Sequence, residues 1–258
     1  MTAAGHGPPL RRKVPMGTDI FGEMLNGLEP LPASSETSTV GESVFTELRN
    51  DILLGALSPG MKLKLSSLQR DYGVSINTLR ENLARLAAEG LVVAEGQKGF
   101  RVVPVSIDDL REVTELRQLI ECHGLRRSIE LGDLDWEGRL VSAHHMLARS
   151  EKLMLEDPDA HGAEWQRFDR QFHVALVSAC NSRWILRMHR VIHDQFRRYQ
   201  ALALKTIGFR GEELLEEHRQ ILECTLNREV DKAVALLGSH IQKGAELPFG
   251  APPATAGS

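Results

Sequence analysis

Cysteines and long apolar runs are scarce in this chain, and each shortage excludes a class of protein. Three of the 258 residues are cysteine (Cys122, Cys180 and Cys224), a number and spacing that suit neither a disulfide framework nor a thiolate zinc cluster. We therefore expect a reducing, cytoplasmic setting. No stretch approaches the roughly 18 apolar residues of a membrane span. No apolar run follows the basic residues 11–13, so the sequence predicts neither a secretory signal nor a membrane partner.

Basic charge is also in short supply. The chain has 31 Lys and Arg against 35 Asp and Glu, a formal net charge of −4, which by itself argues against a nucleic-acid-binding protein. The charge is unevenly spread, however. Residues 41–103 hold eight basic and seven acidic residues, a net of +1, whereas residues 1–40 have a net charge of −1 and residues 104–258 of −4. The acidic excess therefore lies mainly in the C-terminal part and does not exclude DNA binding by residues 41–103.

The pattern of the sequence divides the chain into four segments. Residues 1–40 contain five prolines and no sustained apolar period, so we expect a flexible tail with a short helix at residues 19–28. Residues 248–258 are expected to form a second tail. Residues 41–103 predict a winged helix-turn-helix, and residues 104–247 predict an all-α antiparallel helical bundle. The expected fold class is therefore mainly α.

Residues 41–103 alternate short helices with a hairpin. Apolar periodicity predicts helices at residues 43–54, 65–72 and 76–89, followed by strands at residues 91–94 and 100–103. An α-helix fits the major groove of DNA and points the side chains of its first turns at base edges. The expected DNA contacts are Ser75, Asn77, Thr78 and Arg80 on the reading helix, and Gln97, Lys98 and Arg101 on the hairpin. The alternative is a small α/β appendage with ordinary surface polar groups.

A second group of residues has the composition of a metal site. The group consists of Asp169, His173, His218 and His240. The first two are spaced i, i+4, which puts a carboxylate and an imidazole on one helix face. One carboxylate and three imidazoles suit a divalent ion, with zinc expected first and nickel or manganese as alternatives. A chance arrangement stays open on spacing alone, since His189 and His193 form a rival pair.

Residues 41–103 resemble the winged helix of the GntR transcription regulators. The resemblance runs through residues 57–63, 73–75, 79–83, 89–92 and 99–102. Residues 76–78 depart from the family's usual side chains after the helix cap, so the resemblance implies the fold but not the operator sequence.

Residues 107–245 resemble the FCD domain, the all-helical effector domain of the FadR branch of the same family. The resemblance rests on Leu116-Arg117 with Glu121, on Asp169 and His173, on Glu217-His218, and on His240. It implies that the four metal-site residues hold an ion. It also implies that Arg117 binds a small carboxylate effector, with Arg198 and Tyr199 as further candidates, and dicarboxylates such as glutarate are the expected class. The remaining histidines, including His189 and His193, are expected to be surface or satisfied interior groups.

These features together predict a ligand-responsive transcriptional regulator rather than an enzyme. We expect a homodimer that binds a palindromic double-stranded operator and acts as a repressor released by its effector. Two alternatives remain at this point. The Asp/His site could belong to a metal-dependent enzyme that activates water, or the metal could be purely structural.

Overall fold

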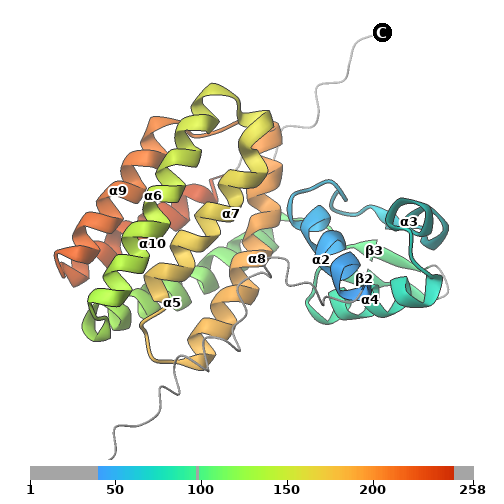
Figure 1. Cartoon of the computed structure of the whole chain (residues 1–258), viewed down its shortest axis with the longest axis horizontal. Helices are drawn as coiled ribbons and strands as arrows, with labels where there is room; N and C mark the ends of the chain where they lie inside the picture. The colour runs from blue at the N-terminus through green and yellow to red at the C-terminus, as the bar shows by residue number, and fades with distance from the viewer. Residues whose placement is uncertain (1–39, 97–98, 247–258) are drawn as a thin grey trace, which may run out of the picture. The chain divides into compact units, whose positions relative to one another are not determined.

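The computed structural model describes residues 40–96 and 99–246 (Figure 1). The tails expected over residues 1–40 and 248–258 fall outside this part, apart from the last residue of the first tail. The short helix expected at residues 19–28 also lies outside the described residues.

Helices and a small sheet alternate in the N-terminal part of the described chain. The elements are α2 (Val40–Leu53), β1 (Lys62–Leu63), α3 (Leu65–Tyr72), α4 (Ile76–Ala88), β2 (Val92–Ala94) and β3 (Phe100–Val102). Both strand pairings are antiparallel and the order is β1-β3-β2, with Val93 opposite Arg101. The sequence predicted each of these elements except β1, because two residues are too few to show a periodic pattern.

One apolar core holds these elements together. Leu48 of α2 is fully buried, and so are Leu79, Leu83 and Leu86 of α4, whose spacing puts them on one helix face. Val102 of β3 packs into the same cluster. The core therefore fixes the rotation of α4 and leaves the polar face of this helix to solvent.

The turn between α3 and α4 has the chemistry that the sequence predicted. Gly73 ends α3 in the left-handed region at φ = 67°, a conformation that glycine adopts without a steric penalty. Ser75 then caps α4, and its hydroxyl accepts the backbone N–H of Thr78 at 3.2 Å. These two residues produce the helix-turn-helix locally.

The rest of the described chain is helical, as predicted. The helices are α5 (Ile107–Leu131), α6 (Leu134–Glu156), α7 (Pro158–Val177), α8 (Arg183–Thr206), α9 (Glu212–Leu226) and α10 (Val230–Gly244). Four of them begin at a capping side chain, namely Ser106, Asp133, Asp157 and Ser182. Helix α5 packs against α7, α8 and α10, and α6 packs against α7 and α9. This arrangement is the predicted helical bundle.

The interior of the bundle combines an apolar core with a polar cluster. Trp136, Leu140, Phe172 and Leu237 are fully buried in one continuous apolar cluster. Beside it lie buried carboxylates, imidazoles and guanidinium groups, which cost free energy unless they are paired or bind an ion. Among the residues that the structure describes, no helix is long and apolar enough to cross a membrane.

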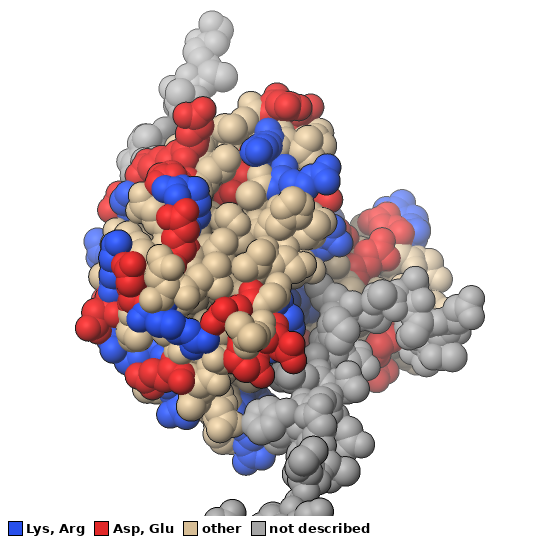
Figure 2. Space-filling model, turned by 60° about the vertical axis from the view of Figure 1, so that its left-hand side comes forward, with Lys and Arg blue, Asp and Glu red and all other residues tan. Residues whose placement is uncertain are grey.

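The charged residues of the bundle do not collect into a single-sign patch on the face that Figure 2 shows. Acidic and basic side chains alternate there around an uncharged area. On this face, the acidic side chains of the C-terminal part are therefore mixed with basic ones.

Candidate metal centre and neighbouring pocket

Three helices bring the four predicted metal ligands together inside the bundle. Helix α7 supplies Asp169 and His173, α9 supplies His218 and α10 supplies His240, and none is more than 6% exposed. Each imidazole offers a ring nitrogen within 4.8 Å of those offered by the other two. The Asp169 Oδ1 atom lies 3.8 Å from His173 Nε2 and 3.7 Å from His218 Nε2. The spacing along the sequence thus becomes one compact donor set.

Each of these imidazoles has a carboxylate on its outer nitrogen. The pairs are His173 Nδ1 with Glu121 Oε2 at 2.8 Å, His218 Nδ1 with Glu151 Oε1 at 2.6 Å, and His240 Nδ1 with Glu217 Oε2 at 2.8 Å. An ionised carboxylate only accepts hydrogen bonds, so Nδ1 carries the proton and donates it. The lone pair is then on Nε2. Carboxylate–histidine pairs of this kind orient the ligands of protein metal sites.

Two of the inner ring nitrogens have no hydrogen-bond partner among the described residues. His173 Nε2 and His218 Nε2 are buried, and no residue in the described part of the chain forms a hydrogen bond with either atom. A buried acceptor without a partner costs about 1–3 kcal/mol. A divalent cation would take up these lone pairs together with the charge of Asp169, so the residues present fit a metal ion.

The protonation states also suit a cation. Burial alone raises the pKa of Asp169, but the neighbouring His173, His218 and Arg117 outweigh burial and leave it below its usual value. Burial lowers the pKa of His173, and it lowers the pKa of His240 to about 3. At neutral pH the carboxylate is therefore ionised and these two imidazoles are neutral, the forms in which they bind metal ions.

Arg117 connects the centre to a neighbouring pocket. Its Nε atom donates to Glu121 Oε1 at 2.7 Å, and its Nη2 atom lies 3.2 Å from His173 Nδ1. The guanidinium lies 4.4 Å from the centroid of the Phe196 ring. Burial raises the pKa of Glu121, but Arg117 and His173 outweigh this effect and hold it well below its usual range. The Arg117 guanidinium thus lies next to the predicted metal ligands, paired with Glu121.

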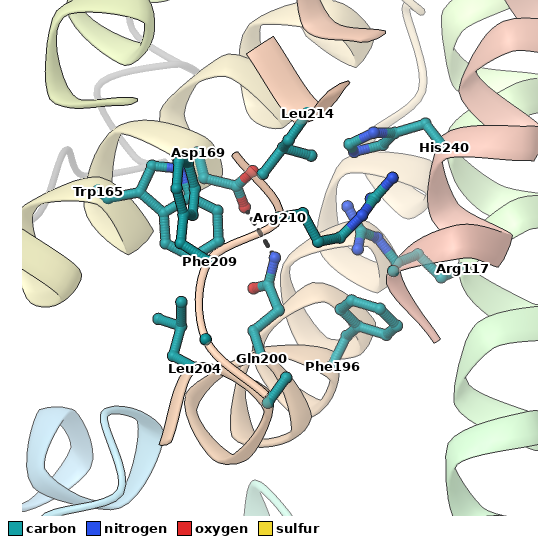
Figure 3. Close-up of a pocket in the computed structure, with 13 residues that line it drawn as sticks. Arg117, Trp165, Asp169, Phe196, Gln200, Leu204, Phe209, Arg210, Leu214 and His240 are labelled. Carbon is teal, nitrogen blue, oxygen red and sulfur yellow. Dashed lines mark hydrogen bonds between the residues drawn. The ribbon is translucent and has the colours of Figure 1, made fainter. Parts of the chain in front are cut away.

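The pocket itself opens beside Asp169 and His240 (Figure 3). Its polar groups are Arg117, Asp169, Gln200, Arg210 and His240, and its apolar side chains are Trp165, Phe196, Ala203, Leu204, Phe209 and Leu214. A concave, largely apolar site with a few convergent polar groups is the usual form of a small-molecule site. Arg117, the first effector-binding candidate from the sequence, is part of the wall.

The other two effector candidates face elsewhere. Arg198 donates to the backbone carbonyls of residues 103 and 104 at 2.9 and 3.0 Å, and the Tyr199 hydroxyl donates to Asp109. Neither lines the pocket, which corrects the expectation that they do. The reason for Arg198 is the phase of α8, which puts it on the opposite side from Phe196 and Gln200. Tyr199 lies next to Phe196 on the helix but packs with it against Leu110 and Val113 of α5.

Two further histidines belong to the polar cluster. His189 Nε2 lies 3.3 Å from Glu121 Oε1, and His193 Nε2 lies 4.0 Å from Asp169 Oδ2. No hydrogen bond reaches either ring nitrogen of His193 from residues 40–96 or 99–246, although the side chain is buried. The expectation of a surface or satisfied interior group is therefore wrong for His193. Its i, i+4 spacing from His189 was the available signal.

Helix α4 presents part of the predicted DNA-contacting set to solvent. Asn77 and Arg80 are exposed. Ser75, also exposed, caps the helix, and its hydroxyl oxygen lies 2.9 Å from that of the half-buried Thr78. Asn77 and Arg80 are therefore open to solvent, whereas the hydroxyls of Ser75 and Thr78 take part in the cap.

Of the three hairpin candidates, the structure describes Arg101. Arg101 pairs with Glu95 at 2.6 Å and donates to the carbonyl of Gly60 at 2.7 Å, so its guanidinium braces the strand ends. Gln97 and Lys98 lie outside the described residues.

A winged helix-turn-helix joined to a helical bundle defines a class, the DNA-binding transcriptional regulators. The chain belongs to the GntR family within that class. The family model described as "Bacterial regulatory proteins, gntR family" matches residues 40–102, and the FCD domain model matches residues 112–243. This membership identifies a regulator that binds DNA operators and not an enzyme, so it removes the metal-dependent enzyme considered from the sequence.

Relatives and solved structures agree with the family. The chain is 36% identical to the HTH-type transcriptional regulator BphR of Paraburkholderia xenovorans, over 83% of this chain and 86% of that protein. It is 30% identical to the HTH-type transcriptional repressor GlaR of Escherichia coli, over 75% of this chain and 89% of that one. The fold matches E. coli McbR/YncC with a TM-score of 0.68 at 20% identity, covering 80% of this chain and 95% of that one.

Glu151 is a candidate-site residue that the sequence did not reveal, and so are Trp165 and Gln200 of the pocket. Glu151 lies on α6, 18 residues before Asp169, and no motif surrounds it. Only the packing of α6 against α9 brings it to His218.

Proposed function

We propose that this regulator is a repressor whose operator binding is controlled by a small organic acid bound beside a divalent metal ion. The observation that carries the proposal is the convergence of Asp169 with three imidazoles whose outer nitrogens are each held by a carboxylate. Arg117 adds a permanent positive charge to the adjoining pocket, and guanidinium groups bind carboxylates well. We propose repression rather than activation because the relative GlaR is a transcriptional repressor.

The ion would be held by Asp169, His173, His218 and His240, with zinc as the first candidate and nickel or manganese as alternatives. When bound, the ion would supply a Lewis-acid centre that an effector carboxylate can ligate. Four protein ligands complete a tetrahedral zinc shell but leave positions open on a six-coordinate ion. Acid binding that requires the metal therefore supports this proposal, whereas a closed shell supports a purely structural metal.

We also propose that the regulator works as a homodimer on a palindromic operator in the cytoplasm. Trp184, Met188 and Val191 form an apolar stripe along α8 at i, i+4 and i+7, exposed by 57%, 39% and 48%. Leu116 and Leu119 of the neighbouring α5 are also exposed, at 46% and 70%. A second copy is the occupant we propose, because one reading helix on a domain of net charge +1 has little phosphate attraction of its own.

One experiment separates these possibilities. The full chain is purified without chelator, its metal content is measured, and its binding to DNA from upstream of its own gene is followed by fluorescence anisotropy. We expect about one divalent ion per chain, release of DNA on adding a small organic acid such as glutarate, and loss of that response after chelation. A response that survives complete removal of metal would contradict the metal-assisted site.

A matched pair of variants tests the role of the pocket. Arg117→Ala should abolish the response to acid while the metal is retained. Arg111→Ala, on the same helix with a side chain 73% exposed, should leave the response intact. Bound metal with no acid response in the unmodified chain would favour the purely structural metal.

A further inference from the structure

Two polar atoms in the pocket wall have no hydrogen-bond partner in the described part of the chain. They are the indole Nε1 of Trp165, a residue only 4% exposed, and the amide Oε1 of Gln200. Both residues line the pocket beside the metal centre. An indole N–H only donates a hydrogen bond and an amide oxygen only accepts one, so the wall presents one unmet donor and one unmet acceptor.

The orientation of the Gln200 amide is set by its other end. Its Nε2 atom donates to Asp169 Oδ2 at 3.2 Å, drawn as the dashed line in Figure 3. An ionised carboxylate accepts only, so the amide nitrogen must face Asp169 and the oxygen must face away from it. The unmet acceptor is therefore a property of the hydrogen-bond network and does not depend on an arbitrary choice of amide rotamer.

The described side chains around these two atoms form no hydrogen bond with either of them. Phe209 packs edge-on against Trp165, with ring centroids 5.5 Å apart and planes at 74°, and Leu204 and Leu214 are apolar. Arg210 also lines the pocket, but its guanidinium already pairs with Glu217 at 2.7 Å and has Glu213 at 3.6 Å. Arg210 is thus paired in the same way as Arg117, whose Nε atom donates to Glu121 Oε1 at 2.7 Å, and neither pairing excludes a ligand carboxylate.

We infer that the effector is a hydroxy acid, whose carboxylate binds at the Arg117 end and whose hydroxyl bonds to Trp165 Nε1 and Gln200 Oε1. A hydroxyl both donates and accepts, so it has the two hydrogen-bond functions that these atoms call for. A carboxylate in the same place would satisfy the indole but set a negative oxygen against the amide oxygen. This inference rests on the proposed organic-acid site and narrows it from the dicarboxylates expected at first. A pocket built to hydrogen-bond a hydroxyl discriminates strongly against ligands that lack it.

The test compares straight-chain acids that differ only at the far end. Calorimetry with the metal-loaded full chain measures butyrate, 3- and 4-hydroxybutyrate and succinate, and then the corresponding five-carbon series. We expect a hydroxy acid to bind at least about tenfold more tightly than its alkanoate and its dicarboxylate. Equal or tighter binding of the dicarboxylates would overturn the hydroxyl inference and leave the organic-acid site standing. No binding by any acid, with metal retained, would overturn the proposed function itself.

Two variants assign the hydroxyl contact to this wall. Trp165→Phe removes the N–H but keeps an aromatic ring, and it should weaken hydroxy-acid binding about five- to tenfold without affecting the alkanoate. Arg111→Ala changes an exposed side chain outside the pocket and should change neither affinity. Gln200→Leu provides a second test should Trp165→Phe unfold. Equal loss for both ligands in the pocket variants would show a packing effect and contradict the assignment.

The indole proton of the metal-loaded protein gives a direct readout of this contact that does not require DNA. The chain has three tryptophans, so ¹⁵N-labelled protein gives three indole N–H resonances, and Trp165→Phe identifies the relevant one. We expect the hydroxy acid to shift this resonance and the alkanoate to shift it much less. An unmoved Trp165 resonance at saturating hydroxy acid would refute the contact.

Discussion

Glu151 Oε1 lies 2.6 Å from His218 Nδ1, the shortest of the three carboxylate–imidazole contacts around the candidate metal centre. Both residues are fully buried. The contact holds the proton on Nδ1 and directs the Nε2 lone pair of His218 to the position that the other ligands share. Glu151 is thus a positioning residue for a ligand supplied by another helix.

We predict that Glu151→Gln weakens metal binding about 10- to 100-fold, the usual cost of altering a carboxylate behind a histidine ligand. The amide keeps the size of the side chain but removes the charge that favours the Nδ1 tautomer. Competition with a chromophoric chelator measures the affinity. Glu156→Gln, an exposed change on the same helix, is the control and should bind metal like the parent chain. Equal affinities in all three proteins would show that Glu151 does not position His218.

The exposed face of α4 leads to a prediction about DNA. Arg80→Ala should weaken operator binding at least about tenfold, because a side chain that reaches a base edge contributes about 1–3 kcal/mol. The melting temperature should barely move, since Arg80 is exposed. Arg111→Ala is again the comparison. Unchanged operator affinity of Arg80→Ala would mean that α4 is not the reading helix.

The apolar stripe on α8 leads to a prediction about assembly. Trp184→Glu places a charge in the proposed dimer interface, so light scattering should give a mass near the 28.7 kDa of one chain instead of twice that value. Operator affinity should fall with it. Leu134→Glu, at a residue 82% exposed on α6, should leave the mass unchanged. A Trp184→Glu protein that stays dimeric would place the interface elsewhere.

A buried carboxylate on α8, Asp194, predicts a pH dependence of stability. Asp194 is 4% exposed and accepts from Arg170 Nε at 3.2 Å, with Arg197 at 3.7 Å. Burial raises its pKa, but Arg170 and the other arginines outweigh burial and leave it below its usual value. A lowered pKa stabilises the fold above about pH 4, and this contribution is lost as the pH falls through the folded-state value.

We therefore expect Asp194→Asn to lower the free energy of unfolding by about 2 kcal/mol at pH 7. The difference from the parent chain should be constant between pH 7 and 5 and should shrink below about pH 4. Urea unfolding at each pH measures it, with the exposed Asp159→Asn as the control. A difference that grows on acidification would contradict the direction of the pKa shift.

Local chemistry explains why much of this fold could be predicted. Gly73 and Ser75 produce the helix-turn-helix within a few residues, and the leucine stripe of α4 fixes its rotation. The resemblance also supplied the four ligand positions in order. Which face of α8 lines the pocket was harder to predict, because this helix has polar residues on several faces. Only the packing shows that Gln200 faces the pocket whereas Arg198 does not. Glu151 needed the same three-dimensional information.

Helix α8 contributes both to the pocket and to the contacts with the segment that follows β3. Phe196 and Gln200 of this helix line the pocket. Arg198 and Tyr199 of the same helix form hydrogen bonds with the segment at residues 103–109 that follows β3. Backbone hydrogen bonds between residues four apart make the helix continuous, so both sets of side chains project from one element. Under the proposed function, an effector in the pocket would therefore contact the same helix that binds the segment leading out of the DNA-reading domain.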